Sequence, residues 1–133
     1  MTMNLGVSER LQPILEKVTK LMQEEVLAAD REFHAEVGKS GDRWKMSDRQ
    51  KEIIADLQAK ARAQDLWNFW LTDSEKGYGL STVEYAHLAE QMGWCVLGPQ
   101  VFNCSAPDTG NMEVLERYGN EEHKKQWLSL IHI

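Results

Sequence analysis

The fold class follows from one stretch of the chain, residues 11–37, which reads LQPILEKVTKLMQEEVLAADREFHAEV. Apolar residues recur in this stretch at every third or fourth position, the spacing that gathers them on one face of an α-helix. Pro13 suits the first turn of a helix, where its missing N–H breaks no hydrogen bond, and Gly38 ends the pattern. The stretch therefore predicts one long amphipathic helix whose apolar face packs against other elements.

Two further helices are predicted by capping boxes. In this motif the Ser side chain accepts a hydrogen bond from the backbone N–H of the residue three positions later. The side chain of that later residue accepts in turn from the backbone N–H of the Ser. One box is residues 47–50, SDRQ, and the other is residues 81–84, STVE. The apolar pattern after the first box ends near Gln64, and the pattern after the second ends at Gly93. Each box therefore predicts a helix of medium length.

Three shorter helices are predicted in the last third of the chain. Pro99 begins the first of them. Thr109 or Asn111 caps the second, which Gly119 ends, and Asn120 caps the third. Because the sequence contains no convincing pair of strands, these segments together predict an all-α fold of about six helices.

Residues 66–71, LWNFWL, are too short for a helix of their own and predict an irregular, buried connection. The aromatic rings of Trp67, Phe69 and Trp70 could form a platform for a ligand. Large aromatic side chains more often fill a core, and we favour that interpretation.

Composition excludes several classes of protein. The chain has 133 residues, the size of one domain, and its net charge of −6 disfavours binding to nucleic acid. No run of about 20 apolar residues occurs, so we expect no membrane span. The N-terminus shows no signal peptide, and Cys95 and Cys104 lie outside any C-x-x-C pattern. We therefore expect free thiols and a cytoplasmic protein.

The sequence contains one metal-like pattern, Glu84-x-x-His87. A ferritin-like di-iron site needs two such pairs and two further glutamates, and no second Glu-x-x-His occurs. We therefore interpret His87 as a polar helix residue. Asp30 and His34, four residues apart, are expected to form a solvated pair on a helix flank.

Residues 94–107, WCVLGPQVFNCSAP, carry no charge and only isolated polar side chains. This composition is typical of the wall of a mostly apolar ligand pocket. A buried core helix would have the same composition, so the residues alone leave both interpretations open.

Four segments in order resemble the N-terminal helical domain of acyl-CoA dehydrogenases, in the branch of family members ten and eleven. The first is the P-I-L-x-x-V start of the long helix, and the second is residues 61–71, ARAQDLWNFWL. The third is the helix that opens with GLS at 79–81, and the fourth is residues 118–128, YGNEEHKKQWL. Residues 102–112, FNCSAPDTGNM, are the segment most typical of that branch.

The resemblance implies an FAD-dependent oxidoreductase that converts an acyl-CoA to its trans-2-enoyl-CoA. It also implies an electron-transfer flavoprotein as electron acceptor and assembly into homo-oligomers. In the family, the main flavin-binding residues and the catalytic glutamate belong to later domains. We therefore expect these 133 residues alone to be inactive.

For this domain the resemblance implies a part of the wall around the acyl chain. Matched position by position, the wall residues are Gln100, Val101, Cys104 and Asp108. Two alternatives from other classes are a free-standing helical interaction module and a ferritin-like di-iron protein.

The last five residues are expected to be a non-native tail, which leaves residues 1–128 as the domain. Residues 128–133 read LSLIHI, the translation of a transposase adaptor used in sequencing libraries. The family continues differently after Trp-Leu, with Pro-Leu-Leu-x-Gly. Resequencing the locus without adaptors tests this expectation, and a native gene that stops after Ile133 would contradict it.

Overall fold

The computed structural model describes residues 5–72 and 77–128 of the chain. The expected tail, residues 129–133, lies outside the described residues. All regular elements in the described ranges are helices, which confirms the predicted all-α fold. None of these helices is both long enough and apolar enough to cross a membrane.

The long helix predicted over 11–37 is present as one continuous rod of three parts. These are α1 (Gln12–Leu21), the π-helical turn η1 (Met22–Val26) and α2 (Leu27–Ala35). π-Helical turns are rare and often lie near functional sites. The rod ends two residues earlier than predicted, and Gly38 follows with a φ of 81°.

Both capping boxes form as predicted. Ser47 caps α3 (Asp48–Ala63) and accepts from the Gln50 N–H at 3.1 Å, and Gln64 is the last, capping residue. Ser81 caps α4 (Thr82–Met92) and accepts from the Glu84 N–H at 3.3 Å. Local sequence therefore fixes the start of both helices.

The last three helices are present, and the first two of them begin at other residues than predicted. They are α5 (Gly98–Val101), α6 (Asp108–Tyr118) and α7 (Glu121–Trp127). Asn120 caps α7 as predicted, since its side chain accepts from the His123 N–H at 2.8 Å. The predicted cap of α6 at Thr109 or Asn111 is wrong. Pro107 occupies the cap position without a side-chain bond, and the Thr109 and Asn111 N–H groups already donate to carbonyls four residues earlier.

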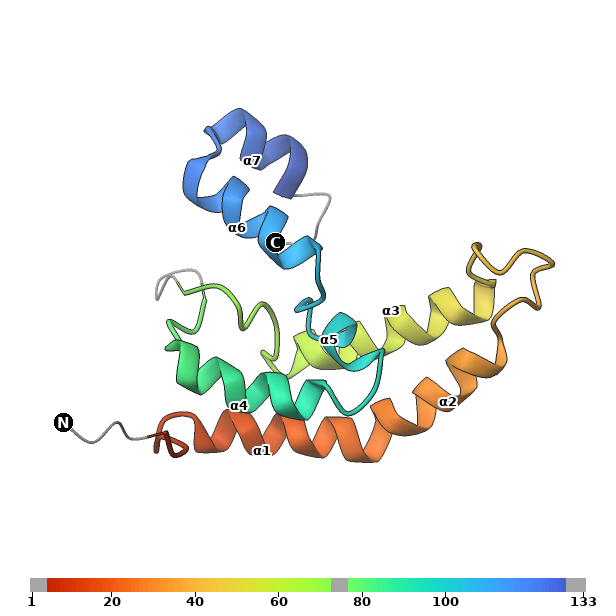
Figure 1. Cartoon of the computed structure of the whole chain (residues 1–133), viewed down its shortest axis with the longest axis horizontal. Helices are drawn as coiled ribbons and strands as arrows, with labels where there is room; N and C mark the ends of the chain where they lie inside the picture. The colour runs from red at the N-terminus through yellow and green to blue at the C-terminus, as the bar shows by residue number, and fades with distance from the viewer. Residues whose placement is uncertain (1–4, 73–76, 129–133) are drawn as a thin grey trace.

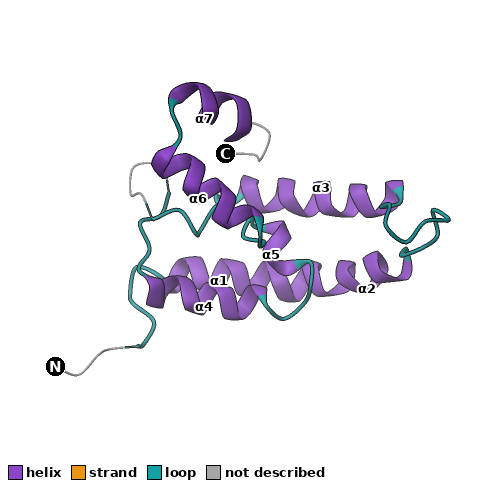
Figure 2. Ribbon diagram, turned by 45° about the horizontal axis from the view of Figure 1, so that its top comes forward, coloured by secondary structure: helices purple, strands orange, loops and turns teal. Residues whose placement is uncertain are grey.

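The helices form two parts (Figure 1). In one part, α4 lies along α1, α3 lies along α2, and the short α5 lies between α3 and α4. In the other part, α6 and α7 form a hairpin that stands to one side of this layer (Figure 2). Residues 102–107 link the two parts.

The core lies where the rod meets α3, α4 and α5. Its fully buried side chains include Met22 and Val26 of the π turn, Leu88 of α4 and Phe102 after α5. Gly98 brings α5 against the end of α4 so closely that a Cβ there would lie 2.0 Å from the Met92 carbonyl oxygen.

The connection at 66–71 is irregular and buried, as predicted. The Phe69 ring lies in the core with 1% of its surface exposed, and its centroid is 5.8 Å from that of Phe102. Trp70 is 8% exposed, and Trp67 is half-buried with the Arg62 guanidinium 4.2 Å above its ring. Phe69 and Trp70 therefore fill the core, as favoured over a ligand platform.

Candidate functional site

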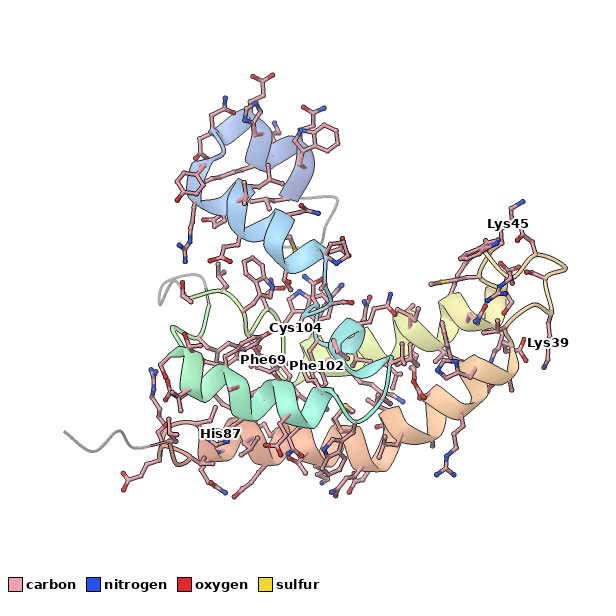
Figure 3. The ribbon with its side chains drawn as sticks, in the orientation of Figure 1. Lys39, Lys45, Phe69, His87, Phe102 and Cys104 are labelled. Carbon is pink, nitrogen blue, oxygen red and sulfur yellow. The ribbon has the colours of Figure 1, made fainter. Side chains whose placement is uncertain are left out.

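Three of the four candidate wall residues lie on α5 and the residues directly after it. Val101 and Cys104 are buried, with 1% and 8% of their surfaces exposed, whereas Gln100 is partly exposed. Figure 3 shows Cys104 beside Phe102 and Phe69, where α5 meets the buried connection. The structure thus leaves Gln100 partly accessible and buries the other two side chains.

Asp108 lies apart from these three residues. It is exposed and begins α6, beyond the turn formed by residues 105–107. Its carboxylate is in the first turn of α6, where the positive end of the helix dipole favours an acidic side chain. The structure therefore assigns Asp108 a position on the α6–α7 hairpin.

The Cys104 thiol is packed as a small apolar group. Its Sγ donates to the Phe102 carbonyl oxygen at 3.4 Å, and its backbone N–H donates to the Pro99 carbonyl oxygen at 2.7 Å. Burial raises the pKa of this thiol from its ordinary value of 9 to about 11. Since a thiolate is the nucleophilic form, Cys104 is neutral and unreactive at physiological pH.

Two polar side chains fix the backbone of the α5 region, and neither of these contacts was predicted from the sequence. The Gln58 amide on α3 donates to the Gln100 carbonyl oxygen at 3.1 Å. The Asp30 carboxylate on α2 accepts from the Leu97 N–H at 3.1 Å. These contacts span 42 and 67 residues, so no local pattern indicates them.

The predicted solvated pair of Asp30 and His34 is only partly correct. Their charged atoms are 3.6 Å apart, and the His34 side chain is 50% exposed. The Asp30 side chain is 16% exposed because it reaches the turn before α5. Its main contact is therefore a tertiary one.

An asparagine pair joins the candidate wall to the buried connection. Asn68 and Asn103 have left-handed backbones, with φ of 58° and 54°. The Asn103 side-chain amide donates to the Asn68 side-chain oxygen at 2.6 Å, and the Asn68 N–H donates to the Phe102 carbonyl oxygen at 3.1 Å. Asn tolerates this conformation better than most residues do. The pair ties the end of α5 to the buried connection 66–71.

The Glu84-x-x-His87 pattern has other partners. Arg10 and Ser8 both donate hydrogen bonds to the Glu84 carboxylate. The Arg10 Nε lies 2.7 Å and the Ser8 hydroxyl oxygen 2.6 Å from the Glu84 Oε1. These bonds and the one from the Ser81 N–H hold the pKa of Glu84 well below its ordinary value of 4.5. A His87 ring nitrogen lies 3.0 Å from the Leu5 carbonyl oxygen. Both residues thus tie the start of the chain to α4.

No group of three or more possible metal ligands occurs within residues 5–72 and 77–128. A groove of 520 Å³ lies between the rod and α3. Five acidic side chains line it against two basic ones. These charges would repel the diphosphate of FAD. The groove therefore does not fit FAD. Its acidic and basic lining residues are Glu24, Glu25, Glu32, Glu52, Asp56, Arg49 and Lys60.

The sequence matches the family model described as "Acyl-CoA dehydrogenase, N-terminal domain" over residues 8–131. This chain belongs to the acyl-CoA dehydrogenase family. The predicted family and helical domain are thereby confirmed. The match also favours this interpretation over the interaction module and the di-iron protein.

Curated acyl-CoA dehydrogenases show the same relationship. Acyl-CoA dehydrogenase family member 10 of Mus musculus is 44% identical over 128 residues, covering 92% of this chain and 12% of the mouse protein. Family member 11 of Homo sapiens is 45% identical over 121 residues, covering 88% of this chain and 14% of the human protein. The chain thus spans less than a sixth of these relatives.

A solved structure agrees with the assignment. It is described as a putative acyl-CoA dehydrogenase from Mycobacterium abscessus, and it superposes with a TM-score of 0.81 at 41% sequence identity. The superposition covers 95% of this chain and 32% of the mycobacterial one. The arrangement of helices described above is therefore that of an acyl-CoA dehydrogenase N-terminal domain.

Proposed function

We propose that these residues act as the N-terminal helical domain of an FAD-dependent acyl-CoA dehydrogenase that oxidises acyl-CoA to trans-2-enoyl-CoA. The observation that carries the proposal is the family match over residues 8–131. The TM-score of 0.81 with a mycobacterial acyl-CoA dehydrogenase supports it independently.

We assign the wall of the acyl pocket to Gln100, Val101, Cys104 and Asp108, of which Asp108 lies apart from the others at the start of α6. Support comes from the uncharged stretch 94–107, whose composition is typical of a mostly apolar pocket wall. Gln100 is the partly exposed member, and Gln58 fixes its backbone. A wall of this kind gives an acyl chain apolar contact and one polar group for orientation.

The cofactor and the partners follow from the family. FAD would be held mainly by residues outside these 133, so the chain alone should bind flavin weakly and catalyse nothing. The whole enzyme would be a cytoplasmic homo-oligomer that passes electrons to an electron-transfer flavoprotein.

A chimera tests the domain's function. Residues 8–128 replace the matching segment of human acyl-CoA dehydrogenase family member 11, to which this chain is 45% identical over 121 residues. We expect the purified chimera to retain flavin and to reduce an electron-accepting dye when acyl-CoA is supplied as the substrate. A folded chimera that holds flavin but no longer responds to acyl-CoA would contradict the proposal and favour an interaction module.

A second variant of the chimera tests the pocket wall. Gln100→Leu removes the polar group without adding bulk, so KM for acyl-CoA should change while flavin content stays the same. Gln126→Leu, an exposed position on α7, is the matched control. If both variants have the same kinetics, Gln100 is not part of the pocket wall.

The 133-residue chain itself should remain colourless after dialysis against FAD. A spectrum of bound flavin would contradict its expected inactivity.

A further inference from the structure

The loop between α2 and α3 exposes large apolar side chains next to basic ones. We define the tip loop as residues 36–46, EVGKSGDRWKM. It lies at the far end of the two helices, remote from the α6–α7 hairpin (Figures 1 and 2). Trp44 is 85% exposed there, with Val37 at 48% and Met46 at 44%. Large apolar side chains gathered at an exposed tip indicate a contact surface.

The charge around the tip is opposite to that of the whole chain. The tip loop contains three basic and two acidic side chains, a net charge of +1. Because the whole chain carries −6, all other residues together carry −7. The next basic side chain, Arg49, is paired with Glu32 and Glu52. An anionic surface at the tip therefore meets a loop of net positive charge on an acidic molecule.

The basic side chains of the tip loop are accessible. The side chains of Lys39 and Lys45 are 60% and 78% exposed, and both lie at the outer edge of the loop (Figure 3). Their acidic neighbours are Glu36, 2.5 Å from Lys39, and Asp42, 4.0 Å from Lys45. Both lysine side chains are well exposed, although the Glu36 side chain is only 19% exposed. Ion pairs with an exposed lysine contribute little, so both lysines can turn to a phosphate. The Arg43 guanidinium lies 5.2 Å from the centre of the Trp44 ring.

Internal hydrogen bonds hold the loop in shape. The Ser40 hydroxyl donates to the carbonyl oxygens of Asp42 at 2.9 Å and Lys45 at 3.0 Å. The Trp44 N–H donates to the Asp42 carboxylate at 2.9 Å. Trp44 is thus presented outward by an ordered turn, which reduces the entropy lost when it binds.

We propose that the tip loop binds the surface of an anionic phospholipid bilayer, with Trp44 at the level of the headgroups. Tryptophan prefers the membrane–water interface because its ring is apolar and its N–H is polar. Lys39, Arg43 and Lys45 contact the lipid phosphates, and Val37 and Met46 enter the boundary of the acyl region. The occupant is a lipid surface because the patch pairs exposed apolar residues with basic ones at a convex tip.

Vesicle co-sedimentation of the 133-residue chain tests the proposal. Circular dichroism first verifies that each variant is helical. We expect binding to vesicles of phosphatidylcholine with phosphatidylserine, little binding to phosphatidylcholine alone, and weaker binding at high salt. The double variant Lys39→Glu with Lys45→Glu should lower the partition coefficient roughly tenfold or more. Trp44→Ala should lower it about threefold or more, and tryptophan emission should shift to the blue only when Trp44 is present.

Matched controls separate the tip from the rest of the surface. Lys17→Glu with Lys20→Glu makes the same change of charge at exposed positions of α1, and Tyr118→Ala removes an 80% exposed ring from α6. Both controls should bind vesicles as the parent chain does. The proposal is overturned if the folded chain ignores anionic vesicles, or if the controls weaken binding as much as the tip variants. It is also overturned if the tip variants alter self-association instead of vesicle binding.

Discussion

Asn103 donates a hydrogen bond from its side-chain amide to the Asn68 side-chain oxygen at 2.6 Å, and both residues have a left-handed backbone. Asn68 is 7% exposed, so the contact is shielded from water. The pair connects the buried connection 66–71 with the end of α5. It therefore sets the position of the candidate wall relative to the core.

Replacing Asn103 should separate the contribution of its hydrogen bond to stability from that of its left-handed backbone. Asn103→Gly keeps the left-handed backbone and loses the hydrogen bond, which costs about 1 kcal/mol of unfolding free energy. Asn103→Ala also forces an alanine into the left-handed region, which adds about 1–2 kcal/mol. Urea unfolding measures both values. Asn111→Ala on the exposed side of α6 is the control, and an alanine variant at 103 as stable as the glycine variant would contradict the role of the backbone.

Gly98→Ala should destabilise the chain by about 3 kcal/mol or more. The added Cβ would lie 2.0 Å from the Met92 carbonyl oxygen and 3.0 Å from the Met22 side chain, so backbone has to move. Gly110→Ala is the matched control, because nothing lies within 4 Å of its Cβ and the residue is helical. There the same change should stabilise by about 0.5–1 kcal/mol. Thermal unfolding that ranks the two variants the other way would refute this packing.

The ion pair of Glu84 with Arg10 predicts a loss of stability in acid. The Arg10 bond, then those of Ser8 and Ser81, lower the pKa of Glu84 from its ordinary value of 4.5. A carboxyl with a lowered folded pKa adds stability above its unfolded pKa, and this stability is lost as the pH falls towards the folded pKa. The difference in unfolding free energy between the parent and Glu84→Gln should therefore shrink as the pH falls below about 4.5.

Asp48→Asn provides the comparison for that experiment. Lys51 lowers the pKa of Asp48 as well, but the Asp48 side chain is 94% exposed and its ion pair is screened by water. This variant should keep nearly the whole acid dependence of the parent chain. An equal loss in both variants would show that burial of Glu84 is unimportant.

The two thiols should react in a fixed order. Burial raises the pKa of both, and that of Cys104 reaches about 11, so roughly one Cys104 in a thousand is a thiolate at pH 8. Cys95 is less buried than Cys104. Ellman's reagent at pH 8 should therefore modify Cys95 first and Cys104 only after unfolding. A Cys95→Ser variant that still reacts rapidly while folded would contradict the buried position of Cys104.

Local sequence predicted the elements whose causes lie within a few residues. The capping boxes at 47–50 and 81–84 fixed two helix starts, and the apolar period of 11–37 fixed the rod. The cap of α6 was predicted wrongly because Thr109 or Asn111, a polar residue after Pro107, was assigned the capping role. Pro107 itself holds that position. The π turn at Met22–Val26 has no sequence signal of comparable strength.

The sequence by itself determined the all-α class, the order of the helices and the family, because periodicity, caps and segment order are written in neighbouring residues. Tertiary structure alone decided which uncharged residues are buried and which polar side chains hold them. Asp30 and Gln58 fix the α5 region from 67 and 42 residues away, and Asn68 meets Asn103 across 35. Such contacts depend on how the helices pack, so the candidate wall became a defined arrangement only in the folded chain.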